Sequence, residues 1–278
     1  MKRYIYTLIA LLTVAACSPE LPDSPGMLVV EGWIENDKAP VVFVTSSLQT
    51  TLDDKSLADL IGHVALDATV TVTHNGQTYK LSPTINDDYL LRVCYTTDKL
   101  KGEVGGIYRL DVDWKGMHAD AQTSIPAPGH VDSIKIERHQ TIDTMYLVKV
   151  HIDPAPEVRY YRFFGMAIGK DSTYTPSYLG TFDCQLNKND MIAVNRGRNH
   201  PIYENDYYYS MNDSVRFKLA SIESDAYEFW RKLDENVMFS HVALLPYYNN
   251  LKSNISGGLG YWFGYGTTYY GLRIKLEQ

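Results

Sequence analysis

The chain has 278 residues and a formal net charge of −7, and 45% of its residues are hydrophobic. This length is sufficient for one large or two medium-sized hydrophobic cores, so we expect two domains. The acidic balance repels a phosphate backbone and argues against nucleic acid as a partner. Tyrosine occurs 22 times, and its flat ring with a polar hydroxyl suits half-buried strands, which favours a β-rich fold.

The N-terminus predicts a lipid-anchored protein. Two basic residues precede an apolar run over residues 5–16, which is too short to span a hydrocarbon layer of about 30 Å. Val14-Ala15-Ala16-Cys17 then has the small-small-Cys form of a bacterial lipoprotein processing site. We expect residues 1–16 to be a signal peptide and Cys17 to carry the lipid. The alternative is an ordinary secretory signal whose cleavage site abuts a cysteine.

A flexible tether is expected over residues 17–27, which hold three prolines and little apolar content. Ordered structure should begin at Leu28. The β-branched and aromatic runs 28–34 and 41–44, separated by a polar turn, predict a first hairpin.

A second hairpin is predicted by the clean alternation of residues 68–73 and 77–81 around Asn75-Gly76, two residues that tolerate positive φ. Further short strands of the same kind follow at residues 89–95, 107–114 and 117–125. Strands at this spacing, without helical periodicity between them, predict an antiparallel Ig-like or transthyretin-like β-sandwich over residues 28–126.

The domain boundary is expected at Pro126-Ala-Pro128-Gly129, which stops both helices and central strands. The second domain, residues 130–278, is also expected to be β-rich. Its predicted strands are 133–137, 145–153, 159–168 and a closing strand at 270–276. Residues 170–209 read as a polar loop.

One amphipathic helix is predicted near residues 221–237. Ile222, Ala226, Phe229, Trp230, Leu233 and Val237 fall on one helical face. Ser221 is the candidate N-cap. We expect the apolar stripe to be core rather than a binding surface.

Two cysteines remain once Cys17 is assigned to lipid. Cys94 and Cys184 could form a disulfide across the domain boundary in an oxidising envelope compartment. Equally, each could be a small buried hydrophobic residue on its own strand.

Motifs for catalysis are incomplete. The run 165–170 is one spacer residue short of a phosphate loop, and the run 111–122 lacks two oxygen ligands of a calcium loop. No two of the eight histidines have the i, i+4 spacing of a helical zinc site, and no Gly-x-Ser-x-Gly elbow occurs. We therefore expect no enzyme activity, cofactor or metal, although a zinc site built from distant residues stays open.

One glycine-aromatic cluster, residues 253–265, is the candidate binding element. Glycines allow close backbone approach, and aromatic faces beside them suit a sugar or peptide. The candidate contacts are Asn254, Tyr261, Trp262 and Tyr265. The alternative is a tight loop leading into an aromatic strand that packs on the helix.

Six segments together resemble a family of Bacteroidetes lipoproteins, the domain of unknown function 4249 family. These segments are residues 28–34, 68–72, 106–110, 123–128, 160–163 and 253–261. The resemblance covers nearly all of the chain after Cys17, and the tyrosine-rich ending after Trp262 is less like the family. It implies an outer-membrane lipoprotein, often encoded beside TonB-dependent transporters, with a β-sandwich N-terminal domain and no established catalytic residues.

We therefore expect a non-enzymatic protein anchored by lipid to the cell outer membrane, with its periplasmic or surface-exposed face left open. It would bind a ligand, such as a glycan or peptide, or a partner for a TonB-dependent transporter. The alternatives are a surface structural or adhesive subunit and, less favoured, a hydrolase with a dispersed site. Because sandwich folds host many functions, fold alone does not choose among these.

Overall fold

The computed structural model describes residues 26–47, 63–89, 91–187, 190–196, 207–239 and 251–275. The expected signal peptide, the lipidated Cys17 and most of the expected tether lie outside these residues. They stay predictions.

The mainly β prediction is confirmed. The described residues form fifteen strands and one helix, α4 (Ser224–Phe239). The strands are β1 (Leu28–Glu35), β2 (Val41–Ser46), β3 (Thr69–His74), β4 (Gln77–Ile85), β5 (Val93–Thr96), β6 (Ile107–Trp114), β7 (Met117–Ser124), β8 (His130–Arg138), β9 (Met145–Asp153), β10 (Tyr160–Ala167), β11 (Thr175–Asp183), β12 (Ile192–Val194), β13 (Tyr209–Ser210), β14 (Ser214–Ile222) and β15 (Gly258–Arg273). Eleven of them form one curved sheet in the order β11-β10-β14-β15-β1-β2-β5-β4-β3-β6-β7, and β8, β9, β12 and β13 form a second sheet.

Both predicted N-terminal hairpins are present. β1 pairs antiparallel with β2, and β3 pairs with β4. Asn75 and Gly76 have φ values of 49° and 77°, as a tight two-residue turn requires. Alternate residues of β1 to β7 point into one shared core, which also contains Trp262 of β15. We call β1 to β7 with the first half of β15 the N-terminal unit.

The C-terminal unit consists of β8 to β14, α4 and the second half of β15. Its core lies between the small sheet and β10, β14 and β15, where Val148, Val150, Phe163 and Phe217 are fully buried. A third cluster lies on the opposite face of the large sheet, between that face and α4. Alternate residues of β10 and β14 therefore face either the small sheet or α4. Both faces of this part of the large sheet are covered by other elements.

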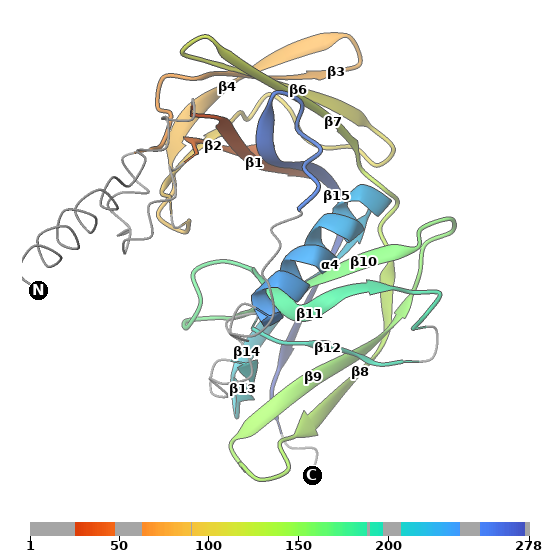
Figure 1. Ribbon diagram of the computed structural model, residues 1–278. Helices are drawn as coiled ribbons and strands as arrows, with labels where there is room; N and C mark the ends of the chain where they lie inside the picture. The colour runs from red at the N-terminus through yellow and green to blue at the C-terminus, as the bar shows by residue number, and fades with distance from the viewer. Residues whose placement is uncertain are drawn as a thin grey trace, which may run out of the picture.

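Strand β15 joins the two units, as Figure 1 shows. Residues 258–265 pair in parallel with β1, and residues 266–273 pair antiparallel with β14. The predicted division into residues 28–126 and 130–278 stays a prediction, but the first half of β15 belongs with β1 in space. Gly264 permits this arrangement, because a Cβ there would lie 2.0 Å from the carbonyl oxygen of Ser124.

The segment between the units is held by hydrogen bonds. The backbone amide of Gly129 donates to Ser221 Oγ at 3.0 Å, and Thr268 Oγ1 donates to the Gly129 carbonyl at 2.6 Å. At the start of α4, Ser124 Oγ donates to Glu223 Oε1 at 2.6 Å. These contacts fix α4 and the two units relative to one another.

Two local predictions about the second half of the chain were wrong. Residues 170–209, predicted as a loop, contain β11, β12 and the first residue of β13, because Tyr178 and Phe182 pack there although most of their neighbours are polar. Ser221 is not an N-cap. It lies in β14 with its hydroxyl bound to Gly129, and α4 begins at Ser224.

The disulfide that the sequence left open is not formed. Cys94 is a buried free thiol on β5 of the N-terminal unit, and Cys184 is a half-buried free thiol after β11. These strands lie in different units, so the thiols pack separately. Among the described residues, no helix is long and apolar enough to cross a bilayer.

Candidate functional site

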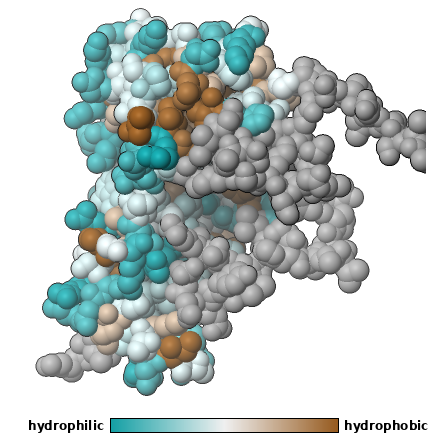
Figure 2. All heavy atoms as spheres, turned by 90° about the vertical axis from the view of Figure 1, so that its left-hand side faces the viewer, coloured by the Kyte–Doolittle hydropathy of each residue, from teal (hydrophilic) through white to brown (hydrophobic). Residues whose placement is uncertain are grey.

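A cleft of about 870 Å³ lies between the two units, and its volume falls in the range of roughly 300–1,000 Å³ typical of small-molecule sites. Figure 2 shows this side of the molecule, which is hollowed between its upper and lower halves. Aromatic and charged side chains dominate the lining, which includes Trp33, Glu35, Lys38, Tyr89, Phe164, Tyr174, Arg216, Lys218, Trp230, Tyr261, Tyr265, Tyr269 and Tyr270.

Strand register builds the floor of the cleft. Phe164 of β10 lies opposite Lys218 of β14, and Lys218 lies opposite Tyr269 of β15. Four residues earlier on β15, Tyr265 lies beside Glu35 of β1. Because residues two or four apart on a strand share a face, this pairing places side chains from four strands on one surface.

A buried ion pair lies at the centre of the floor. Lys218 Nζ donates to Glu35 Oε1, and the Tyr269 hydroxyl donates to Glu35 Oε2. Burial alone would raise the pKa of Glu35, but the positive charge of Lys218 and the hydrogen bonds from Lys218 and Tyr269 outweigh it and lower the pKa. Glu35 is therefore an anion that neutralises Lys218.

The Lys218 ammonium is surrounded by aromatic rings as well as by Glu35. It lies 4.4 Å from the ring centroid of Phe164, 5.7 Å from that of Tyr174 and 6.0 Å from that of Tyr265. Cation–π attraction grows when the cation is desolvated, and Lys218 is only 7% exposed. These contacts hold the ammonium in place.

Helix α4 forms one wall and is fixed by two polar contacts. Trp230 Nε1 donates to the Tyr265 hydroxyl at 3.1 Å. Beneath the Trp230 ring, 4.5 Å from its centroid, lies the guanidinium of Arg162. Arg162 is 2% exposed and binds both carboxylate oxygens of Asp234, at 3.1 and 3.3 Å. This wall is therefore pre-organised.

The opposite wall comes from the N-terminal unit. The rings of Trp33 and Tyr89 meet edge to face at 5.9 Å, and Phe43 supports Tyr89 at 5.3 Å. Burial, as the largest cause, raises the pKa of Tyr89 to about 12, so its hydroxyl is a hydrogen-bond donor at neutral pH. Trp33 and Tyr89 are only half-buried and keep surface available to the cleft.

The four candidate contacts predicted from the sequence separate into two groups. Tyr261 and Tyr265 line the cleft. Trp262 does not, because it is fully buried and its Nε1 donates to the Tyr108 carbonyl at 3.1 Å. The side chain of Asn254 accepts a hydrogen bond from the Trp262 backbone amide at 2.9 Å and donates one to the Trp262 carbonyl at 2.8 Å. Trp262 and Asn254 are therefore placed as structural residues.

Several cleft residues were missed by sequence reasoning, chiefly Trp33, Glu35, Tyr174, Lys218 and Tyr269. One signal was present at residues 214–222, where Val215, Phe217 and Leu219 alternate with polar residues. This period indicates a strand whose second face carries Arg216 and Lys218.

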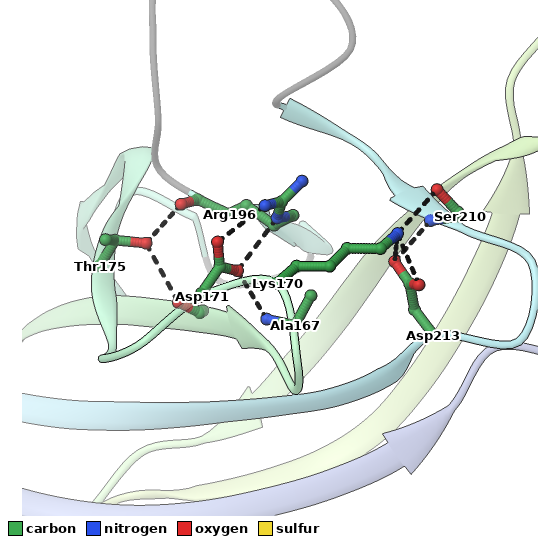
Figure 3. Close-up of polar contacts among 8 residues, drawn as sticks. Ala167, Lys170, Asp171, Thr175, Arg196, Ser210 and Asp213 are labelled. Atoms are coloured by element: carbon green, nitrogen blue, oxygen red, sulfur yellow. Dashed lines mark hydrogen bonds and ion pairs between the residues drawn. The ribbon is translucent and has the colours of Figure 1, made fainter. Parts of the chain in front are cut away.

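A second polar cluster, shown in Figure 3, is structural. Buried Asp171 accepts hydrogen bonds from the Ala167 amide at 2.7 Å and from Arg196 at 2.7 and 3.0 Å. Lys170 contacts Asp213 at 2.7 Å. Arg196 neutralises Asp171, and Lys170 neutralises Asp213. The two ion pairs stabilise the turn that follows β10. The described residues contain no group of three His, Cys, Asp or Glu side chains suited to a metal.

The fold and the cleft define a mainly β protein of two units that share one strand and enclose an aromatic cleft over a buried ion pair. This chain belongs to the family described as "Domain of unknown function (DUF4249)", whose model matches residues 15–270. No curated protein matches the chain.

Among solved structures, the crystal structure of domains A168-A170 from titin is similar, at 7% identity and a TM-score of 0.21. The similarity covers 71% of this chain and 60% of the titin chain. At this TM-score it says nothing about the cleft or its use.

Proposed function

We propose that this protein is a non-enzymatic, lipid-anchored envelope protein that binds a ligand in the cleft for a TonB-dependent outer-membrane transporter. The cleft carries the binding part of the proposal. It combines a volume suited to a small ligand, half-exposed aromatic rings and a few fixed polar groups, which is the usual make-up of a binding site. The lipid anchor is supported by the processing signal at residues 14–17, and the transporter by the family resemblance.

Ligand binding can be followed through the tryptophans of the cleft. Trp33 and Trp230 line it, so a ligand that enters will change the intrinsic fluorescence. We would titrate the full chain in detergent with a library of oligosaccharides and short peptides. A hit should lose most of its affinity in Trp33→Leu and keep it in Trp114→Leu, a control outside the cleft. Failure of every compound, or equal loss in both variants, contradicts binding in the cleft.

The anchor and the partner need separate tests. Mass spectrometry of the N-terminal peptide from native membranes should find lipid on Cys17, with loss of membrane attachment in Cys17→Ser and none in Ser18→Ala. After mild crosslinking, a tagged chain should recover a TonB-dependent transporter in near-equal amount. Recovery of the chain alone would refute the transporter role, and adhesion would then become the leading alternative.

A further inference from the structure

We propose that the ligand of the cleft is an acidic oligosaccharide, whose sugar rings lie on the aromatic side chains and whose carboxylate or sulfate groups bind Lys38 and Arg216. This inference rests on the proposed ligand-binding function and specifies its chemistry. It depends on four properties of the cleft: its charge, its length, its lining and the position of its strands in the sheet.

The charge of the cleft is opposite to that of the protein. Its described lining contains three cations, Lys38, Arg216 and Lys218, and one anion, Glu35. Glu35 neutralises the buried Lys218, which leaves two positive charges in a chain whose net charge is −7. A concave site of one sign concentrates ligands of the opposite sign, so the cleft favours an anion.

The two remaining cations, Lys38 and Arg216, act on two different rings of the cleft, Tyr269 and Tyr174. Lys38 Nζ lies over the Tyr269 ring, 5.3 Å from its centroid. Arg216 is two residues from Lys218 on β14 and lies opposite Gly271, next to Tyr270. Both cations are exposed, and within the described part of the chain neither forms an ion pair with a carboxylate. Lys38 is therefore positioned to hold an anionic substituent above an aromatic ring, and Arg216 adds a second exposed positive charge to the lining.

The aromatic surface is elongated. Tyr261, Tyr265 and Tyr269 follow one another at intervals of four residues along β15, which corresponds to about 14 Å per interval. Tyr269 is exposed and Tyr261 is half-buried, whereas Tyr265 is buried between them. Trp33 and Tyr174 stand beside this row, each half-exposed. A single small ring would cover only part of the distance from Tyr261 to Tyr269, whereas a chain of linked rings spans it.

The lining argues against a lipid. The described aliphatic residues are limited to Ala39, Val41 and Pro176, and the remainder is aromatic or polar apart from Gly271. An acyl chain is bound by aliphatic side chains, whereas tyrosine combines a flat ring face with a hydroxyl. This combination matches a sugar, which presents C–H groups on its ring face and hydroxyls around its edge.

The sheet argues against an extended peptide. Peptides that add to a sheet pair with an exposed strand edge. The floor strands β1, β10 and β14 each have a neighbouring strand on both sides in the sheet order. Their backbone N–H and C=O groups already pair with neighbouring strands. A ligand in the cleft therefore contacts side chains and cannot form the main-chain hydrogen bonds of an added strand.

The test uses the full chain in detergent and matched pairs of oligosaccharides. The probes are oligogalacturonides, alginate oligomers, chondroitin sulfate oligomers and sialyllactose, each beside its carboxyl-reduced or desulfated counterpart. We expect one or more acidic probes to change the tryptophan fluorescence and to bind about tenfold or more tightly than the neutral counterpart, as loss of a charge-assisted hydrogen bond implies. Binding should weaken as salt rises.

Variants locate the anion site. Lys38→Gln with Arg216→Gln should weaken acidic probes by about tenfold or more and leave thermal unfolding unchanged, because both side chains are exposed. The control is Lys115→Gln with Arg109→Gln, which removes the same charge from the N-terminal unit. Lys115 also lies over an aromatic ring, 4.4 Å from the Trp114 centroid.

The outcomes separate this inference from the proposed function. Equal binding of neutral counterparts, or binding of peptides alone, overturns the acidic saccharide and leaves a ligand-binding protein. Equal loss in the control variant overturns the anion site. Absence of any saccharide binding overturns the inference. If the peptides do not bind either, the proposed ligand binding in the cleft is refuted as well.

Discussion

Glu35 is the residue whose environment most affects the stability of the cleft floor. Its carboxylate neutralises the buried Lys218 and accepts the Tyr269 hydroxyl. A buried pair of this kind adds little net stability when intact, but removal of one partner leaves an uncompensated charge. Glu35 therefore acts as a structural requirement of the site rather than as a ligand contact.

We predict that Glu35→Gln lowers the free energy of unfolding at pH 7 by about 3 kcal/mol, since Lys218 would keep its charge in a desolvated place. Urea unfolding measures this loss. The matched control is Glu228→Gln, an exposed carboxyl on α4, which should change stability by less than about 0.5 kcal/mol. The double variant Glu35→Gln, Lys218→Met should recover most of the loss, because it removes both charges. Equal stability of Glu35→Gln and wild type would refute this account of the floor.

The same pair gives a pH dependence. The folded state lowers the pKa of Glu35 from its ordinary value of 4.5. A carboxyl with a lowered pKa stabilises the fold at pH values above 4.5, and this contribution is lost as the pH falls through the folded pKa. The stability difference between wild type and Glu35→Gln should therefore shrink as the pH falls below 4.5, and a difference that stays constant from pH 7 into acid would contradict this account.

At the scale of elements, β15 determines how the cleft is assembled. Its alternate residues face opposite ways, so Trp262 enters the N-terminal core while Tyr261 and Tyr265 reach the cleft. Its glycines let it lie against β7 and the segment between the units. The aromatic residues need this close approach to reach their positions.

We predict that Gly264→Ala destabilises the protein by about 2 kcal/mol or more, because the new Cβ would lie 2.0 Å from the Ser124 carbonyl oxygen and the backbone must shift. Thermal unfolding would measure the effect. Gly271→Ala is the control on the same strand, where the nearest such atom is 3.9 Å away. Equal unfolding temperatures for the two variants would show that the close approach is not required.

Local signals explain which elements could be predicted. The β3–β4 hairpin was correct because Asn75-Gly76 specifies its turn within the hairpin itself. Strand β11 was missed because its burial comes from partners in other segments of the chain, whereas the alternation at residues 214–222 was a usable local signal for β14. The cleft was missed for the same reason, since Glu35 and Lys218 are 183 residues apart in the sequence. Among the cleft residues, only the aromatic ones of β15 were selected from the sequence. Tyr261 and Tyr265 line the cleft, whereas Trp262 is core and Asn254, which precedes β15, binds the Trp262 backbone.

At the scale of the whole molecule, the two units are held by β15, α4 and hydrogen bonds around Gly129 rather than by a disulfide. We predict that a reducing agent leaves the unfolding temperature unchanged, because Cys94 and Cys184 are free thiols in separate units. Thiol titration of the unfolded chain should find both cysteines reactive without prior reduction. A lower unfolding temperature in dithiothreitol would mean that a bridge forms.

The fixed arrangement of the units also bears on binding. Both walls of the cleft are held before any ligand arrives, one by Arg162 and Asp234 and the other by the packed rings of Trp33, Phe43 and Tyr89. A pre-organised site loses less conformational entropy on binding. We therefore expect binding to require little movement of one unit against the other.

The most direct measurement is a crystal structure of the full chain with the tightest-binding oligosaccharide from the screen. We predict sugar rings against Trp33, Tyr174 and Tyr269, and an acidic group within hydrogen-bond distance of Lys38 or Arg216. A ligand bound outside the cleft, on the outer strands or the small sheet, would contradict the assignment of this cleft as the binding site.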